Sequence, residues 1–182
     1  MSPDPDLRKK TIALVGLMGV GKSSIGRRLA TALDLPFHDA DEAVEKAAGR
    51  SVADIFADRG EDEFREGERR VIARLLDEPP HILATGGGAF AQPQTRALIK
   101  AKAISVWLKA DIDVLVRRVG RKDNRPLLKG RDPRAVLEGL ARDRYPAYAE
   151  ADIAVETGDT PHQAAVEAVL AAIAEHVKGV PA

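Results

Sequence analysis

The chain has 182 residues, which is long enough for one domain with a sizeable hydrophobic core. Its 28 Lys and Arg residues balance 28 Asp and Glu residues, so the formal net charge is zero. That balance argues against a surface built to bind nucleic acid or an anionic membrane. The absence of cysteine excludes disulfides, zinc–thiolate sites and thiol nucleophiles, and it fits the cytoplasm, where we expect the protein to act.

Residues 1–10 contain two prolines and alternating charges, which predicts a flexible N-terminal tail before a single domain over 11–182. The basic residues 8–10 and the apolar run after them superficially resemble a signal peptide. However, that run ends in Gly-Lys-Ser-Ser without a small-residue cleavage pattern. No other run approaches the roughly 20 apolar residues that span a bilayer, so we expect no membrane partner.

The most informative stretch is a strand, a glycine-rich loop and a helix. The run 11–15 predicts a strand, and residues 22–33 predict a helix whose inner face carries Ile25, Leu29 and Leu33. Between them, Gly16–Ser23 matches the phosphate-binding loop pattern G-x-x-x-x-G-K-[ST]. Its glycines let backbone N–H groups surround an anion, and the helix N-terminus adds positive potential. The loop therefore predicts binding of a nucleoside triphosphate.

The rest of the chain alternates short apolar runs with helical patterns. Further strands are predicted at 35–38, 81–85, 103–108 and 153–156. Helices are predicted at 41–48, 51–60, 61–76, from about 92, and at 111–119, 133–144 and 161–177. This alternation predicts a three-layer α/β/α fold with a five-stranded parallel sheet. Ligands bind beyond the carboxyl ends of the strands in such sheets.

Two clusters follow predicted strands and are candidates for the same ligand site. Asp39 and Asp41 point to one side of an extended segment, where one carboxylate can hold a metal through water while the other meets a substrate hydroxyl. Helix capping is the simpler alternative. The triple glycine 86–88 lets backbone N–H groups approach a ligand, or serves only a tight turn.

Composition alone favours a structural role for the other candidates. Arg65 and Glu68 have the i, i+3 spacing of a surface ion pair. Arg144 lies at the end of a predicted helix, where an exposed arginine is the simpler interpretation. The charged segment 121–128 is either a solvated loop or a lid that delivers an arginine to a phosphoryl group. The four histidines show no spacing typical of a metal or catalytic site, and Trp107 lies in a core-like run.

The chain resembles the shikimate kinase family from about Thr11 to its last helix. The resemblance rests on six motifs in one order: GLMGVGKSSIGRRLA, FHDADEAVE, GRSVADIFADRGEDEFREGE, ILATGGGA, NRPLL and RYPAY. It implies a P-loop kinase of the nucleoside-monophosphate-kinase type, with a substrate-binding lobe at about 41–76 and a mobile lid at about 120–131. It also implies transfer of the γ-phosphate of ATP to the 3-hydroxyl of shikimate, with Mg²⁺, within aromatic amino-acid biosynthesis.

The resemblance also implies roles for individual residues. The implied ATP-binding residues are Gly19, Val20, Gly21, Lys22, Ser23, Ser24, Arg118, Arg125 and Pro161. The implied shikimate-binding residues are Asp41, Arg65, Gly86, Gly87, Gly88 and Arg144. Ser23 would ligate Mg²⁺ directly and Asp39 through water. The implied catalytic residues are Lys22, Asp41 and the lid residue Arg125.

The chain departs from the family pattern in two places, and other functions stay open. Ser24 replaces the threonine common after the Lys-Ser of the loop, and the lid sequence 121–124 is unusual. The alternatives are a kinase for another small hydroxy acid such as gluconate, a kinase for a nucleoside monophosphate, and an ATP-binding regulatory module without turnover. Zero net charge and the lack of a long amphipathic seam favour a monomer.

Overall fold

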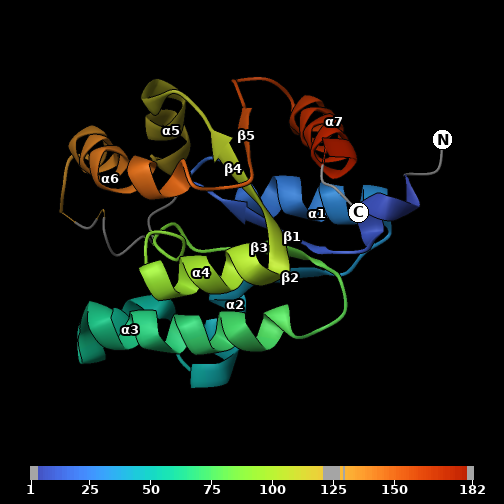
Figure 1. Ribbon diagram of the computed structural model, residues 1–182. Helices are drawn as coiled ribbons and strands as arrows, with labels where there is room; N and C mark the ends of the chain where they lie inside the picture. Colours follow the sequence, from blue (N-terminus) through green and yellow to red (C-terminus); the bar gives the residue numbers. More distant parts are fainter. Residues whose placement is uncertain (1–3, 121–127, 129, 180–182) are drawn as a thin grey trace.

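The computed structural model describes residues 4–120, 128 and 130–179. Its centre is a five-stranded sheet in the order β2-β3-β1-β4-β5, and every pair of neighbouring strands is parallel, as the sequence predicts (Figure 1). The strands are β1 Thr11–Val15, β2 Phe37–Asp39, β3 Ile82–Ala84, β4 Ala103–Lys109 and β5 Ile153–Glu156.

The central strands are mostly apolar and almost entirely buried because both faces of the sheet are covered. Every residue of β1 and β3 is buried, and so is every residue of β4 except Lys109. Such continuous apolar runs are typical of parallel sheets between two helix layers. In register, Ile12 of β1 lies beside Ile82 of β3 and Ile104 of β4.

Helices form the outer two layers. They are α1 Lys22–Leu33, α2 Ala40–Ala48, α3 Val52–Leu76, α4 Pro93–Lys102, α5 Ile112–Val119, α6 Pro133–Tyr148 and α7 His162–Gly179. The α1 and α7 helices lie side by side over the sheet, whereas α4 packs on β4 with α3 outside it (Figure 1). The apolar stripe predicted for α1 is buried against the sheet. Gly26 lets α1 approach β2, since a Cβ there would lie 2.7 Å from the Phe37 ring.

The α2 and α3 helices, which cover most of the stretch 41–76, pack against each other. The side chain of Ser51 caps α3 by accepting a hydrogen bond from the amide of Asp54, at 3.1 Å. Two helices are predicted here, and the structure has one long helix with a kink at Gly60, where φ is 82°. Only glycine takes this conformation without strain, so the predicted boundary corresponds to the kink.

The structure corrects two sequence predictions. Pro5–Arg8, expected in a flexible tail, forms a short 3₁₀-helix capped by Asp4, because burial of Leu7 anchors it. The α6 helix runs through Pro146 to Tyr148, beyond the predicted end at residue 144. Proline in a last turn removes one backbone hydrogen bond, and burial of Tyr148 offsets that loss.

Most of the predicted lid, 121–127 and 129, lies outside the described residues. Leu128, a described residue of the same predicted lid, packs against the hydrophobic core. Within the chain that the structure describes, no helix is both long and apolar enough to cross a membrane.

Candidate active site

The phosphate-binding loop connects the end of β1 to the start of α1, as predicted. Its glycines 16, 19 and 21 have positive φ, and a Cβ at position 16 would lie 2.7 Å from the carbonyl oxygen of Leu108. No side chain caps the N-terminus of α1, and its first turn carries no acidic residue. The free N–H groups and the positive end of the helix therefore favour an anion here.

Lys22 stabilises the loop from inside. Its Nζ donates hydrogen bonds to the carbonyl oxygens of Gly16, at 2.6 Å, and Leu17, at 3.2 Å. The ammonium group therefore lies within the curve of the loop, where bound phosphates would meet it. Ser24, the next residue but one, is exposed and lines the cavity described below.

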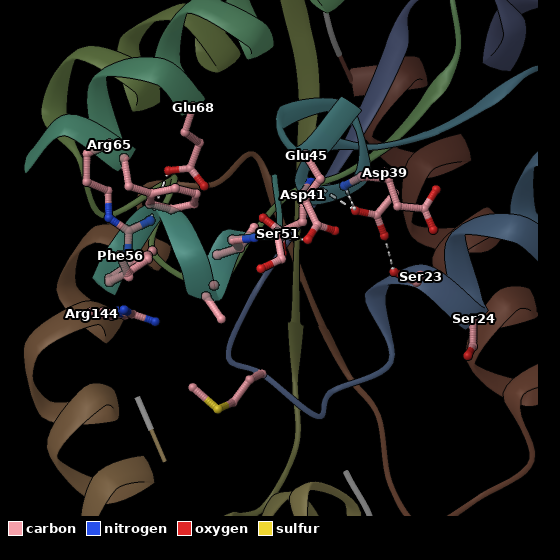
Figure 2. A pocket seen from close by; sticks show the side chains of 18 of the residues that line it. Ser23, Ser24, Asp39, Asp41, Glu45, Ser51, Phe56, Arg65, Glu68 and Arg144 are labelled. Atoms are coloured by element: carbon pink, nitrogen blue, oxygen red, sulfur yellow. Dashed lines mark hydrogen bonds and ion pairs between the residues drawn. The ribbon is translucent and has the colours of Figure 1, made fainter. Parts of the chain in front are cut away.

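Ser23 and Asp39 meet between α1 and β2. The hydroxyl of Ser23 donates to Oδ2 of Asp39 at 2.7 Å (Figure 2). The other oxygen, Oδ1, accepts from the amides of Asp41 and Glu42, so Asp39 caps α2 as well. The two alternatives for this aspartate are therefore compatible, because capping holds the carboxylate toward the serine.

A hydroxyl and a carboxylate are suitable ligands for Mg²⁺, directly or through water. Among the described residues, no group of three His, Cys, Asp or Glu residues could hold a metal ion alone. Mg²⁺ often takes few protein ligands and completes its shell with substrate phosphates and water. The Ser23–Asp39 pair beside the phosphate loop fits such a site.

In the view of Figure 2, Asp41 lies between Asp39 on one side and the Arg65–Glu68 pair on the other. Burial, and then the charge of Asp39, raise the pKa of its carboxyl group, while Lys22 and Arg65 lower it. A Cβ at position 86 would lie 2.7 Å from an oxygen of Asp41 and 3.0 Å from one of Glu68. Glycine therefore suits position 86, because the carboxylates of Asp41 and Glu68 occupy the space that a side chain there would take.

Arg65 and Glu68 form a buried pair on α3, whereas composition favoured a surface pair. Nη1 of Arg65 donates to Oε1 of Glu68 at 2.9 Å, and the side chains are 11% and 1% exposed. Burial raises the pKa of Glu68, and the charge and hydrogen bond of Arg65 oppose this effect. The surface interpretation was wrong because Phe64, Glu68 and Val71 share the inner face of the helix.

Arg144 is also buried, which corrects the expectation of an arginine at the surface. It is 7% exposed, and its Nη1 would lie 3.0 Å from a Cβ at position 87. The carbonyl oxygen of Gly87 accepts a hydrogen bond from the hydroxyl of Tyr148. The C-terminal end of α6 thus contacts the middle of the triple glycine.

These groups surround one cavity of about 1040 Å³ next to the phosphate loop (Figure 2). Its lining includes Ser23, Asp41, Arg65, Arg144 and the glycines 86–88. The structure therefore brings together the sequence-predicted residues for metal and substrate. Phe56 and Phe64 form an apolar part of the wall, with their rings 4.7 Å apart.

Three buried polar atoms on the residues that line this cavity have no hydrogen-bond partner within the described chain. They are Nε of Arg65, Oε2 of Glu68 and Nη1 of Arg144. Buried polar groups are nearly always satisfied, so such atoms in one cavity point to a ligand that would bind them. Two are cationic donors and one is an acceptor, which suits a small molecule carrying both a carboxylate and a hydroxyl group.

The predicted nucleotide contacts are placed in part. Arg118 donates hydrogen bonds to the carbonyl oxygens of Gly19 and Val20 in the loop and to that of Gly158. It thereby joins the loop to the segment before α7, where Pro161 is exposed. Arg125, expected to act as a catalytic residue, lies outside the described residues.

Sequence reasoning missed the role of Glu68, which lines the cavity, and of Tyr148, which packs behind it. A signal for Glu68 was available, since it follows Phe64 by four residues and precedes Val71 and Ile72 on the apolar stripe. A charged residue on such a stripe faces the core, and charged side chains are rarely buried there without an oppositely charged partner. Tyr148 gave no comparable signal because its partner is a backbone carbonyl 61 residues away.

Fold and site together define the class of the protein. A parallel sheet with a phosphate loop after its central strand, and with an acceptor-sized cavity beside that loop, is characteristic of P-loop kinases. A family model for shikimate kinase matches residues 18–174. The chain belongs to the shikimate kinase family.

Individual relatives agree with this assignment. A shikimate kinase of Caulobacter vibrioides is 71% identical over 167 residues, which cover 92% of this chain and 84% of the relative. A shikimate kinase of Bradyrhizobium diazoefficiens is 51% identical over 182 residues, which cover 98% of this chain and 88% of the relative. The solved structure of Acinetobacter baumannii shikimate kinase in complex with shikimate superposes with a TM-score of 0.88 at 35% identity, covering 91% of this chain and 93% of that one.

Proposed function

We propose that this chain transfers the γ-phosphate of ATP to the 3-hydroxyl of shikimate, giving 3-phosphoshikimate and ADP for aromatic amino-acid biosynthesis. The observation that carries the proposal is the set of unpartnered buried atoms on Arg65, Glu68 and Arg144 around one cavity. Shikimate offers one carboxylate and several hydroxyl groups to such a set. Family membership and the Acinetobacter complex with shikimate support the same substrate.

In this proposal Arg65 and Arg144 hold the carboxylate of shikimate. Guanidinium groups suit a planar anion because they can donate parallel hydrogen bonds to both of its oxygens. The glycines 86–88 let the ring of the substrate approach the backbone closely, since a side chain there would collide with Asp41, Arg144 or Arg65. Glu68 orients Arg65 through their 2.9 Å hydrogen bond.

ATP occupies the loop side of the cavity. Residues 19–24 bind its phosphates through backbone N–H groups, Lys22 and the serine hydroxyls. Arg118 and Pro161 lie along the adenine, and Arg125 closes over the phosphates from the lid. Ser23 would hold Mg²⁺ directly and Asp39 would hold it through water; when bound, the ion neutralises charge on the phosphates.

The reaction forms one bond and breaks another at the γ-phosphorus. Asp41 accepts the proton of the 3-hydroxyl, whose oxygen bonds to phosphorus while the bond to the bridging oxygen of ADP breaks. Lys22 and Arg125 stabilise the charge on the transferred group, together with the amides of the loop. The raised pKa of Asp41 makes it a stronger base than an ordinary carboxylate. All of these groups come from one chain, so we propose that the active form is a monomer. We also propose that it acts in the cytoplasm, which the absence of cysteine fits.

The test is coupled ADP release with Mg·ATP and each of three acceptors: shikimate, gluconate and AMP. Release with shikimate alone is expected. Release with only another acceptor would overturn the substrate assignment, and tight ATP binding without turnover would favour a regulatory module. Arg65→Ala should raise the KM for shikimate without unfolding the protein, and an unchanged value would overturn the carboxylate site.

A further inference from the structure

Tyr148 lies behind the substrate site rather than in it. It is the last residue of α6, its side chain is fully buried, and it is not among the residues that line the cavity. Its hydroxyl donates a hydrogen bond to the carbonyl oxygen of Gly87, in the middle of the triple glycine. Tyr148 therefore touches the site only through other groups.

The ring of Tyr148 is held by an aromatic cluster. Trp107 of β4 lies 5.7 Å from it and Tyr145 lies 6.2 Å from it, between ring centroids, while Trp107 and Tyr145 are 5.1 Å apart. Packing of this kind fixes the ring and leaves the position of the hydroxyl little freedom. The carbonyl of Gly87 is thus tied to the core strand β4 through a rigid side chain.

Tyr148 also follows Arg144 by one helical turn on α6. Burial raises the pKa of the Tyr148 phenol to about 12, and the nearby charge of Arg144 acts in the opposite direction. Tyr148 consequently keeps its proton at every pH at which the enzyme would work, so Gly87 keeps its donor. Arg144, Tyr148 and Gly87 form one connected unit, because Nη1 of Arg144 also lies against Gly87.

We propose that Tyr148 is a positioning residue for the acceptor, which fixes Arg144 and Gly87 relative to each other and so sets where the substrate carboxylate binds. The inference rests on the proposed function, because it takes Arg144 as a ligand of that carboxylate. Gly87 also lies beside the phosphate loop, since a Cβ there would be 3.7 Å from the amide nitrogen of Met18 and 3.8 Å from the carbonyl oxygen of Gly16. Arg144 is the group of this unit that would bind the acceptor, so loss of the hydroxyl should weaken binding of the acceptor much more than binding of ATP.

The first experiment measures kinetics of Tyr148→Phe, with Tyr145→Phe as the matched control from the same aromatic cluster. Tyr148→Phe should raise the KM for shikimate about five- to tenfold, the effect expected from loss of one buried hydrogen bond. The kcat and the KM for ATP should stay within about twofold, the pattern of lost ground-state binding. Tyr145→Phe should change none of these. Equal effects on both substrates, or an unchanged KM for shikimate, would overturn the proposal.

A double-mutant cycle separates this inference from the proposed function. Arg144→Met alone should raise the KM for shikimate, and adding Tyr148→Phe should raise it little further, because the guanidinium group that Tyr148 positions is then already absent. If Arg144→Met has no effect, the proposed carboxylate site is wrong. If Arg144→Met acts and Tyr148→Phe does not, or if their effects simply add, the positioning role is wrong.

A spectroscopic probe gives a result that does not depend on removing the hydroxyl. The chain has only two tyrosines, so 3-fluorotyrosine in the Tyr145→Phe protein labels position 148 alone. Shikimate should shift its ¹⁹F resonance, and by more than Mg·ATP does. A resonance that shikimate leaves unchanged would contradict the proposed link between Tyr148 and the acceptor.

Discussion

The guanidinium group of Arg65 fills the space in which a side chain at position 88 would lie. A Cβ built on Gly88 would be 2.2 Å from Nη2 of Arg65 and 2.5 Å from its Cζ. Gly88 thus determines where the arginine can sit, although the two residues belong to different parts of the chain. Because the colliding atoms are the end of a long side chain, the arginine can move away at small cost to stability.

Gly88→Ala should therefore damage function more than folding. We expect the KM for shikimate to rise at least about tenfold, by loss of a charged hydrogen bond, with little change in Tm. Gly67→Ala on α3 is the control, since its Cβ would meet nothing within 4 Å. It should keep full activity and stabilise the helix by about 0.5–1 kcal/mol. Thermal melts measure the change in Tm of both variants, and acceptor titrations measure their KM for shikimate. Similar kinetics for the two variants would refute the role of Gly88.

Lys22→Met should abolish turnover and keep the fold. Lys22 lies inside the phosphate loop, and loss of one such charge in a catalytic site costs about 10²–10³-fold or more in kcat. Lys46→Met is the control, because Lys46 is an exposed residue of α2 that undergoes the same chemical change. Coupled ADP release and circular dichroism measure the two effects. A Lys22 variant that retains activity would show that the loop does not hold the transferred phosphate.

Asp41→Asn should make the protein more stable and less active. Burial raises the pKa of Asp41, so the folded state holds this proton to higher pH than the unfolded chain does. Its contribution to stability is present below the ordinary carboxyl pKa and is lost as pH rises through the folded-state value. At neutral pH, asparagine removes this unfavourable buried charge, and the Tm without ligands should rise by a few degrees.

The same change should lower kcat/KM for shikimate at least about 100-fold, the usual contribution of a general base. Differential scanning fluorimetry at pH 7.5 and steady-state kinetics test both halves of this prediction. A variant that melts lower than the wild type would mean that Asp41 is stabilised by its surroundings and not strained by them.

His81 should make the fold sensitive to acid. It is fully buried, its Nδ1 lies 2.9 Å from the carbonyl oxygen of Pro79, and its ring meets that of His38, which pairs with Glu78. Burial lowers its pKa from 6.5, although Pro79 and Glu78 act in the opposite direction. The unfolded chain then binds this proton at higher pH than the folded chain, so stability falls as pH drops below about 6.5.

Urea unfolding between pH 5 and 8 measures this effect. His81→Asn keeps a polar group near Pro79 and cannot take up the proton, so its free energy of unfolding should depend less on pH below about 6.5. Comparison of the two slopes cancels the titration of all other groups. Parallel slopes would show that His81 is not the acid-sensitive group.

The fold was largely predictable because local signals and the global architecture agree. The strand Thr11–Val15 and the helix Lys22–Leu33 have the predicted bounds, since an apolar run and an amphipathic stripe flank an unambiguous loop. The α6 end and the 3₁₀-helix at Pro5–Arg8 were missed. Both depend on burial of one side chain, Tyr148 or Leu7, against distant parts of the chain, and no local pattern reports that.

The phosphate loop, the two aspartates and the triple glycine were candidates from the residues alone, but the arginines of the site were predictable only with the family resemblance. Composition cannot distinguish an exposed arginine from a buried one, and Arg65 and Arg144 are buried because a cavity and its wall surround them. The burial of Glu68 was readable from its place on the apolar stripe of α3. The roles assigned to the site residues stay predictions, including those of Arg118, Arg125 and Pro161.

The contact between Gly26 and Phe37 makes one buried position decisive for the catalytic centre. Ser23 lies in the first turn of the helix that carries Gly26, and Asp39 ends the strand that Phe37 starts. A side chain at position 26 would have to push the helix off the strand, because its Cβ would lie 2.7 Å from the ring of Phe37. The hydroxyl of Ser23 and the carboxylate of Asp39 would then part. Tolerance to mutation at position 26 is therefore limited by the distance between the Ser23 hydroxyl and the Asp39 carboxylate, which is 2.7 Å. A substitution there can inactivate the protein without altering any residue that binds a ligand.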